Sequence, residues 1–280
     1  ATGSAAIGLY MHGDYGVPKD FAHDVYLSQL RAGEIMKYSI ERMRRDNPYS
    51  RGVVFWQLND CRPVVSWSGI DYFGRWKAQQ YYTKRFFAPV LVSAAVAEGS
   101  ATTQLWVSNE STETVNGTLR WKLRTAGSEI LAQGEAPVVV QAGVSKLVET
   151  VDCKTLAAAH SLKDVYLEYE LVNESEILGQ GTTLLVLAKE FKFRQAKLNA
   201  QVREEKGAYS IELKADCFAK GVALDTAVGD CLFSDNYFDV SADSVKRVLV
   251  QKQDVEGISS AEELQKNLTI TCLNEVMLGM

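Results

Sequence analysis

Cysteine and histidine are scarce in this sequence, and neither is arranged for chemistry. The three histidines, His12, His23 and His160, form no HExxH motif and no pairing with aspartate, so metal-dependent and Ser-His-Asp catalysis are not indicated. The cysteines are dispersed, odd in number and without a CxxC pair, which argues against a disulfide framework and a zinc site. We expect them to be small buried hydrophobic residues. They are Cys61, Cys153, Cys217, Cys231 and Cys272.

The sequence also lacks long apolar runs and an excess of basic charge. No run approaches the about 20 apolar residues that span a bilayer, so no membrane-spanning segment and no membrane partner are expected. Thirty Lys and Arg stand against 35 Asp and Glu, a net charge of -5, without the basic stripe that a phosphate backbone requires. Nucleic acid is therefore not expected as a partner.

What the sequence does contain is typical of folded globular proteins. Apolar residues make up 46% and charged residues 23% of the 280 positions. At about 150 residues per domain, this length predicts about two domains.

The first third of the chain predicts a helix, a buried strand, a polar loop and a second helix. Apolar residues recur every three to four positions from Asp20 to Arg45, with Asp20 as the N-terminal cap and Asn47-Pro48 as the stop. Residues 52–60, GVVFWQLND, carry a continuous apolar run typical of a strand buried on both faces of a parallel sheet. From residue 75 to 87 the helical period returns, and its aromatic side chains favour a packing face.

After Ala88-Pro89 the pattern changes to short alternating stretches separated by turn residues, which predicts antiparallel strands. The stretch 189–201 is mixed and basic and separates two such series. Because alternation places apolar groups on one face and charges on the other, we expect two β-sandwiches, at 89–190 and 191–280. The predicted strands are residues 89–96, 103–109, 117–124, 136–141, 165–172 and 182–188, and then 209–216, 231–240, 245–251 and 268–273.

Three segments of the sequence resemble segments of a known family. WQLND, followed by SWS, DYFGRWK and KRFFAPV between residues 56 and 90, resembles the end of the catalytic barrel in β-mannosidases of glycoside hydrolase family 2. VPKDFAHDVYLSQLRAGEIMKYSIERMRR, which ends at Arg45, resembles the preceding barrel helix, and FSDNYFDV at 233–240 resembles a strand of their C-terminal immunoglobulin-like domain. The resemblance implies a mixed fold: residues 1–88 as the C-terminal remnant of a (β/α)₈ TIM barrel, and 89–190 and 191–280 as immunoglobulin-like β-sandwiches.

The resemblance further implies a C-terminal fragment of a retaining exo-β-mannosidase, which hydrolyses terminal β-D-mannosyl residues without a cofactor or metal. A secreted, periplasmic or lysosomal-type compartment would suit such an enzyme. In the family both catalytic groups are glutamates on earlier barrel strands, so no catalytic residue is expected here and the isolated chain should be inactive. The Asn-Glu pairs at 109, 173 and 274 are expected to be turns at strand ends, and Glu34 and Glu41 are expected to be solvated helix charges.

Five residues are candidates for binding substrate. The indole of Trp56 can stack on a pyranose or pack in a core, and Trp67 can narrow the pocket or brace its loop. Asn59 and Asp60 lie where the predicted strand meets its loop, where they can bind sugar hydroxyls, orient catalytic side chains or cap a turn. Arg62 stands where β-mannosidases usually have tryptophan, which replaces an apolar surface with a charged donor.

Two alternatives stay open beside the mannosidase hypothesis. One is another family 2 activity, such as β-galactosidase or exo-β-glucosaminidase, and the other is a non-catalytic carbohydrate-binding or structural module. The expected partners are a β-mannoside or oligosaccharide substrate and the remaining N-terminal part of the enzyme.

Overall fold

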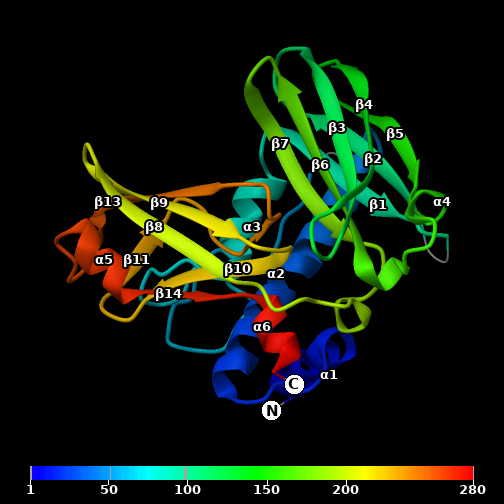
Figure 1. The fold of residues 1–280 in the computed structure, drawn as a ribbon. Helices are drawn as coiled ribbons and strands as arrows, with labels where there is room; N and C mark the ends of the chain where they lie inside the picture. The colour runs from blue at the N-terminus through cyan, green and yellow to red at the C-terminus, as the bar shows by residue number, and fades with distance from the viewer. Residues whose placement is uncertain (1, 51, 98–99, 280) are drawn as a thin grey trace. The chain divides into compact units, whose positions relative to one another are not determined.

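The computed structural model describes residues 2–50, 52–97 and 100–279. The chain forms two compact units, each assembled from separate segments (Figure 1). Unit 1 contains Ala1–Glu34, Trp56–Tyr82 and Phe193–Met280, and unit 2 contains Ile35–Phe55 and Thr83–Lys192. Residues 1–88 thus contribute to both units. The predicted domain limits at 88 and 190 stay a prediction.

Three helices occupy the first 88 residues: α1 (Thr2–Tyr15), α2 (Phe21–Arg45) and α3 (Ala78–Phe86). The sequence predicted α2 and α3 correctly to within a few residues. Asp20 caps α2 as expected, because its carboxylate accepts a hydrogen bond from the His23 backbone N–H at 3.0 Å. Helix α1 was not predicted, since its small and glycine-rich sequence has no helical apolar period.

The predicted buried strand at 52–60 is wrong. Between α2 and α3 the described residues hold only two isolated β-bridges, which join Ile70 to Asn59 and to Trp76. Val54 is 98% exposed and Trp56 is 78% exposed, whereas Val53 and Phe55 are half-buried, so the run is not buried on both faces. A strand of a parallel sheet pairs along its length with at least one neighbouring strand, and the described part of residues 52–60 has only the single bridge at Asn59. The barrel remnant expected for residues 1–88 is accordingly not confirmed.

Unit 2 contains an antiparallel sandwich of two sheets. Leucine and valine side chains from both inner faces, such as Leu105, Leu119, Leu123 and Leu167, form its core. One sheet has the order β1 (Val90–Val96), β2 (Thr102–Asn109), β5 (Val144–Asp152), and the other has β4 (Ile130–Val140), β3 (Val115–Thr125), β6 (Val165–Asn173), β7 (Glu176–Leu184). A short helix, α4 (Cys153–Ala157), follows β5.

Strand β7 begins six residues before the predicted strand at 182–188, and β5 was not predicted. The glycines near the start of β7 are typical of a turn, but in the structure they allow neighbouring residues to pack closely against the strand. An added Cβ at Gly179 would lie 3.1 Å from Val92 Cγ2, and one at Gly181 would lie 2.6 Å from the Tyr169 hydroxyl oxygen.

Unit 1 contains the second sandwich, also of two antiparallel sheets. Its core includes Ile211, Leu213, Val222 and Val248, together with Tyr81 of α3. The sheets are β11 (Cys231–Phe233), β13 (Lys246–Val255), β9 (Ala208–Ala215), β8 (Leu198–Glu205), and β12 (Phe238–Val240), β10 (Ala219–Thr226), β14 (Leu268–Thr271). Helices α5 (Ala261–Asn267) and α6 (Leu273–Leu278) complete it.

Strands β8 and β10 were not predicted, and the predicted strand at 231–240 is split into β11 and β12. The polar residues SDNY at 234–237 interrupt it, where the Asn236 side chain bonds both the N–H and the C=O of Leu224. The described chain is therefore mostly β-sheet in two immunoglobulin-like sandwiches, with helices from its first third.

Candidate functional site

The loop between α2 and α3 carries all five predicted site residues, and residues 56–77 of it belong to unit 1. Backbone hydrogen bonds hold its two arms together. The N–H of Ile70 donates to the C=O of Leu58 at 2.9 Å, and the N–H of Asp60 donates to the C=O of Ile70 at 3.0 Å. At the far end, the N–H of Lys77 donates to the C=O of Gly69 at 2.9 Å. The loop is therefore ordered, although it forms no sheet.

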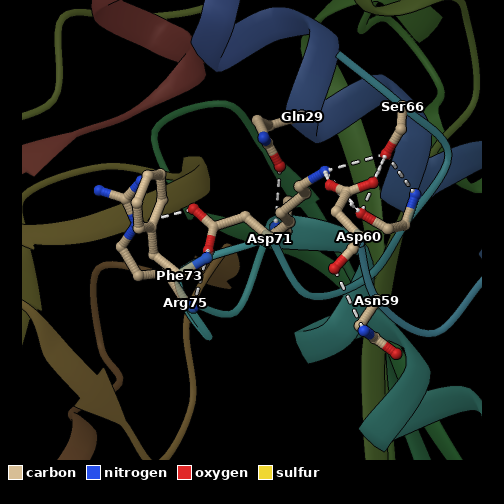
Figure 2. Close-up of polar contacts among 10 residues, drawn as sticks. Gln29, Asn59, Asp60, Ser66, Asp71, Phe73 and Arg75 are labelled. Atoms are coloured by element: carbon tan, nitrogen blue, oxygen red, sulfur yellow. Dashed lines mark hydrogen bonds and ion pairs between the residues drawn. The ribbon is translucent and has the colours of Figure 1, made fainter. Parts of the chain in front are cut away.

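A buried ionic cluster lies at the centre of this loop (Figure 2). The Asp60 carboxylate accepts from Ser66 Oγ at 2.5 Å through Oδ1, and from Ser68 Oγ at 2.7 Å and Lys77 Nζ at 2.9 Å through Oδ2. Lys77 Nζ also donates to Ser68 Oγ at 2.7 Å and to Ser66 Oγ at 3.4 Å. All three ammonium protons of Lys77 and both carboxylate oxygens of Asp60 are thus engaged. We call these four residues the Asp60 cluster.

The Asp60 cluster fixes the charge of its carboxyl group. The Asp60 side chain is 1% exposed and the Lys77 side chain 15%. Hydrogen bonds from Ser66, Lys77 and Ser68, together with the positive charge of Lys77, outweigh burial and lower the pKa of Asp60 to about 2. At neutral pH Asp60 is a carboxylate with occupied oxygens, and it is not a proton donor.

The other four predicted site residues lie on the outside of the loop. Trp56 and Trp67 are both exposed, the latter by 65%, and Arg62 is exposed as well. Asn59 is exposed too, and it lies on the opposite side of Asp60 from Ser66, with its Nδ2 donating to the Asp60 backbone C=O at 3.2 Å (Figure 2). The core alternative for Trp56 is therefore wrong, while its contact with a sugar stays a prediction, as do those of the other four.

Sequence reasoning missed Lys77, Ser66 and Ser68. The two serines flank Trp67 in SWS, so alternation would place them on the side opposite the indole, which is a signal the sequence did contain. Lys77 lies 17 residues from Asp60, at the start of α3, and nothing local links the two.

Several apolar side chains near the two tryptophans in sequence are exposed as well. Leu58, Val64 and Val65 are exposed beside them in sequence, followed by Tyr72 and Phe73. Such a surface can stack on pyranose rings or associate with another apolar surface.

The predictions for other acidic residues need correction. Glu41 is not solvated: it is 4% exposed, with Lys37 Nζ at 3.0 Å and Arg45 Nη1 at 3.9 Å. Glu34 is half-buried and contacts the Tyr15 hydroxyl and, at 2.7 Å, Lys220 Nζ. Both carboxylates are partly or fully buried and therefore need a positively charged or hydrogen-bonding partner. The spacing of apolar residues along the helix does not indicate those partners.

Of the three Asn-Glu pairs, the pair at 173 forms the turn between β6 and β7, with Glu174 at a φ of 53°, and the pair at 109 ends β2. The turn prediction is wrong for Asn274, which lies in α6 and donates to the C=O groups of Arg194 and Phe218, each at 2.8 Å. Cys61 is exposed, contrary to expectation, whereas Cys153, Cys217 and Cys272 are buried.

Among the described residues, no three His, Cys, Asp or Glu side chains lie close enough together to hold a metal ion. No described helix is long and apolar enough to cross a membrane.

The folds of the two units agree with comparisons to known domain families. Residues 101–190 match the model of a mannosidase Ig/CBM-like domain, and residues 193–276 match that of an Ig-fold domain of the mannosidase type. The two sandwiches are therefore similar to immunoglobulin-like domains of mannosidases.

Comparison with whole proteins makes this more specific. The chain is 25% identical to the β-mannosidase of Bos taurus, over 78% of this chain and 26% of the relative, and 25% identical to that of Rattus norvegicus, over 91% and 30%. A β-mannosidase B of Neosartorya fischeri is 31% identical over 44% of this chain and 17% of the relative. The chain thus spans less than a third of the length of these relatives.

Two solved structures share the fold over nearly the whole chain. The β-D-mannosidase of Dictyoglomus thermophilum has a TM-score of 0.85 at 22% identity, covering 96% of this chain and 32% of that one. An exo-chitosanase of Amycolatopsis orientalis has a TM-score of 0.74 at 14% identity, covering 94% and 35%. The resemblance of this chain to the C-terminal part of β-mannosidases is confirmed.

Proposed function

We propose that these 280 residues act as the C-terminal part of a retaining exo-β-mannosidase that releases terminal β-linked mannose. The observation that carries the proposal is the pair of exposed tryptophans, Trp56 and Trp67, on a loop ordered by a buried ion pair. Exposed indoles on an ordered loop suit stacking on a pyranoside, because little conformational freedom is lost on binding. The β-mannosidase relatives support the choice of sugar.

In this proposal residues 1–88 end a (β/α)₈ barrel whose remaining strands come from the N-terminal part of the enzyme. Exposed apolar side chains at 54, 56, 58 and 65 support it, since an apolar surface of this kind favours association with a partner. Residues 52–60 would gain strand neighbours only from that partner.

The chemistry must come largely from outside this chain. Retaining hydrolysis requires a nucleophilic carboxylate and an acid/base carboxyl group about 5 to 5.5 Å apart. Residues 56–77 offer only Asp60, whose oxygens both accept hydrogen bonds, and Asp71, whose Oδ2 accepts from Arg75 Nε at 2.7 Å. The roles left to this chain are stacking by the tryptophans and hydrogen bonds from Asn59 and Arg62 to sugar hydroxyls or the leaving group.

The test compares the chain alone with the complete enzyme on p-nitrophenyl β-mannoside, β-galactoside and β-glucosaminide. We expect turnover only by the complete enzyme and fastest on the mannoside. A preference for another glycoside would favour the related family 2 activity. Turnover by the chain alone at a comparable rate would refute the assignment, since both catalytic carboxylates would then lie within it.

A second candidate is a carbohydrate-binding module, favoured by the Ig/CBM-like family model over residues 101–190. Calorimetric titration of the chain with β-mannobiose tests it. Saturable binding that survives substitution of Trp56 and Trp67 by alanine would place the binding site in unit 2 instead of the loop.

A further inference from the structure

We propose that Asp60, Ser66, Ser68 and Lys77 are positioning residues that hold Trp56 and Trp67 in place for the sugar, and that Asp60 does not itself touch the sugar. This inference rests on the proposed function. The sequence left substrate binding, orientation of catalytic side chains and a turn cap open for Asp60; the geometry points to an indirect role through the two tryptophans.

The first step concerns the hydrogen bonds and the burial of the Asp60 carboxylate. Each serine hydroxyl has one proton to donate, and the Asp60 carboxylate is the nearest acceptor for both, at 2.5 Å from Ser66 and 2.7 Å from Ser68, while the two hydroxyl oxygens lie 3.0 Å apart. Lys77 supplies the remaining donor to Asp60 and donates to both serine oxygens as well. With three donors on its two oxygens the carboxylate keeps one lone pair on Oδ1, but the side chain is 1% exposed, so a sugar hydroxyl could reach it only if the cluster opened.

The second step follows the backbone from the Asp60 cluster to the two indoles. Trp67 lies between Ser66 and Ser68, so two of its immediate neighbours are tied to one carboxylate. The C=O of Trp67 accepts from the N–H of Gln57, at 3.3 Å, which is the residue after Trp56. The cluster and this bond fix both tryptophans relative to each other.

The third step connects the loop to the sandwich of unit 1. Lys77 immediately precedes α3, whose first N–H, at Ala78, donates to Gln29 Oε1 at 3.1 Å (Figure 2). Tyr81, one turn later, is in the core of the sandwich and packs against the Trp76 ring at 5.3 Å. Lys77 is thus a cation anchored beside α3, and its hydrogen bonds to Asp60, Ser66 and Ser68 tie the loop to that helix.

The experiment uses the 280-residue chain labelled with 5-fluorotryptophan, so that ¹⁹F NMR reports all five tryptophans at once. Lys77→Met should shift or broaden the lines of Trp56 and Trp67, assigned by their phenylalanine variants. The lines of Trp106 and Trp121, which lie on β2 and β3 of unit 2, should not move. Lys77→Arg, which keeps the charge, should restore the two loop lines in part.

Arg75→Met is the matched control, because it removes a cation of the same loop whose ion pair with Asp71 is exposed. It should leave the lines of Trp56 and Trp67 unmoved. If Lys77→Met leaves them unmoved as well, the positioning role is overturned. Should Lys77→Met fail to fold, Ser66→Ala, which removes one hydrogen bond and leaves the ion pair, decides the same question.

Kinetics of the complete enzyme form the second arm. Lys77→Met should lower kcat/KM for p-nitrophenyl β-mannoside by about 100-fold, the effect of misplacing binding groups by about 1 Å. Asp60→Asn should lower kcat/KM similarly. The double variant should lose no more kcat/KM than Lys77→Met alone, since each substitution disrupts the same Asp60 cluster. Additive losses would show that Asp60 has a separate contact with the sugar and would overturn the proposal.

The two arms separate this inference from the proposed function. The NMR readout needs no sugar and decides whether the Asp60 cluster orders the two tryptophans. If the complete enzyme were inactive on every aryl glycoside, the proposed function would be refuted. The claim that the two tryptophans are positioned for a sugar would then be refuted as well.

Discussion

Replacing Lys220 with methionine tests how a buried charge network stabilises unit 1. Lys220 Nζ lies 2.7 Å from Glu34 Oε1 and 3.7 Å from Asp239 Oδ2. Although burial alone lowers the pKa of Lys220, the carboxylates of Asp239 and Glu34 raise it above its ordinary value, so the lysine is charged. With an effective dielectric constant of about 20, Coulomb's law gives about 6 and about 4.5 kcal/mol for the two pairs, before desolvation is subtracted.

The net loss is smaller, because desolvation offsets most of that attraction. Removing one partner of a buried pair costs about 3–5 kcal/mol. Here we expect about 2–4 kcal/mol, since Glu34 and Asp239 are partly exposed and keep hydrogen bonds from the Tyr15 hydroxyl and the Gly221 N–H.

Urea unfolding followed at the ¹⁹F line of Trp76, which packs against the core of unit 1, measures this loss. Lys252→Met is the matched control, since the Lys252–Glu204 pair is exposed and should contribute little to stability. Equal midpoints for the two variants would refute the reasoning, because the buried network would then contribute no more than a surface pair.

Three further changes have expected outcomes of the same kind. Gly221→Ala should cost unit 1 about 1–3 kcal/mol in urea unfolding, since φ is +62° there and the new Cβ would lie 2.9 Å from the Tyr26 hydroxyl oxygen. Arg44→Met should lower the urea midpoint of unit 2, and Arg44→Lys should not rescue it, because the guanidinium donates to the C=O of Phe86 at 2.6 Å and to other acceptors in a fork that lysine cannot reproduce. Because the pKa of Asp60 is lowered to about 2 in the folded chain, its contribution to stability is complete above its unfolded pKa of about 3.9 and is lost as pH falls through about 2. Thermal unfolding between pH 5 and pH 2 should therefore show a smaller pH dependence for Asp60→Asn than for the wild type; equal slopes would contradict the lowered pKa.

The sequence was most informative where one element carries its own pattern. Helix α2 has a cap and a sustained apolar period, and β6 alternates apolar and charged residues, so both were predicted closely. The run at 53–56 has the same apolar composition as a buried strand, but burial depends on neighbours that a local pattern does not contain. The glycines of β7 misled for a related reason, since they look like a turn until the side chains beneath them are known.

The candidate site was predicted unevenly for the same reason. Trp56, Trp67 and Asn59 were found through motifs, and all are exposed on one loop. The occupied state of Asp60 and the part played by Lys77 depend on a contact across 17 residues, which no spacing rule indicates.

The core of unit 1 has a consequence for how its sandwich can be isolated. The family model for the Ig-fold domain begins at residue 193, yet Tyr81 is one of the buried residues of that core, and Glu34 supplies a carboxylate to Lys220. A polypeptide that began at residue 193 would lack both residues. The loss of Tyr81 would leave a cavity beside Phe233 and Tyr237, and the loss of Glu34 would leave Lys220 with one carboxylate fewer. The smallest part of unit 1 that folds cooperatively is consequently made of segments that are far apart in the sequence. A shortened chain would have to keep the helices of residues 1–88 together with the sandwich that follows residue 193.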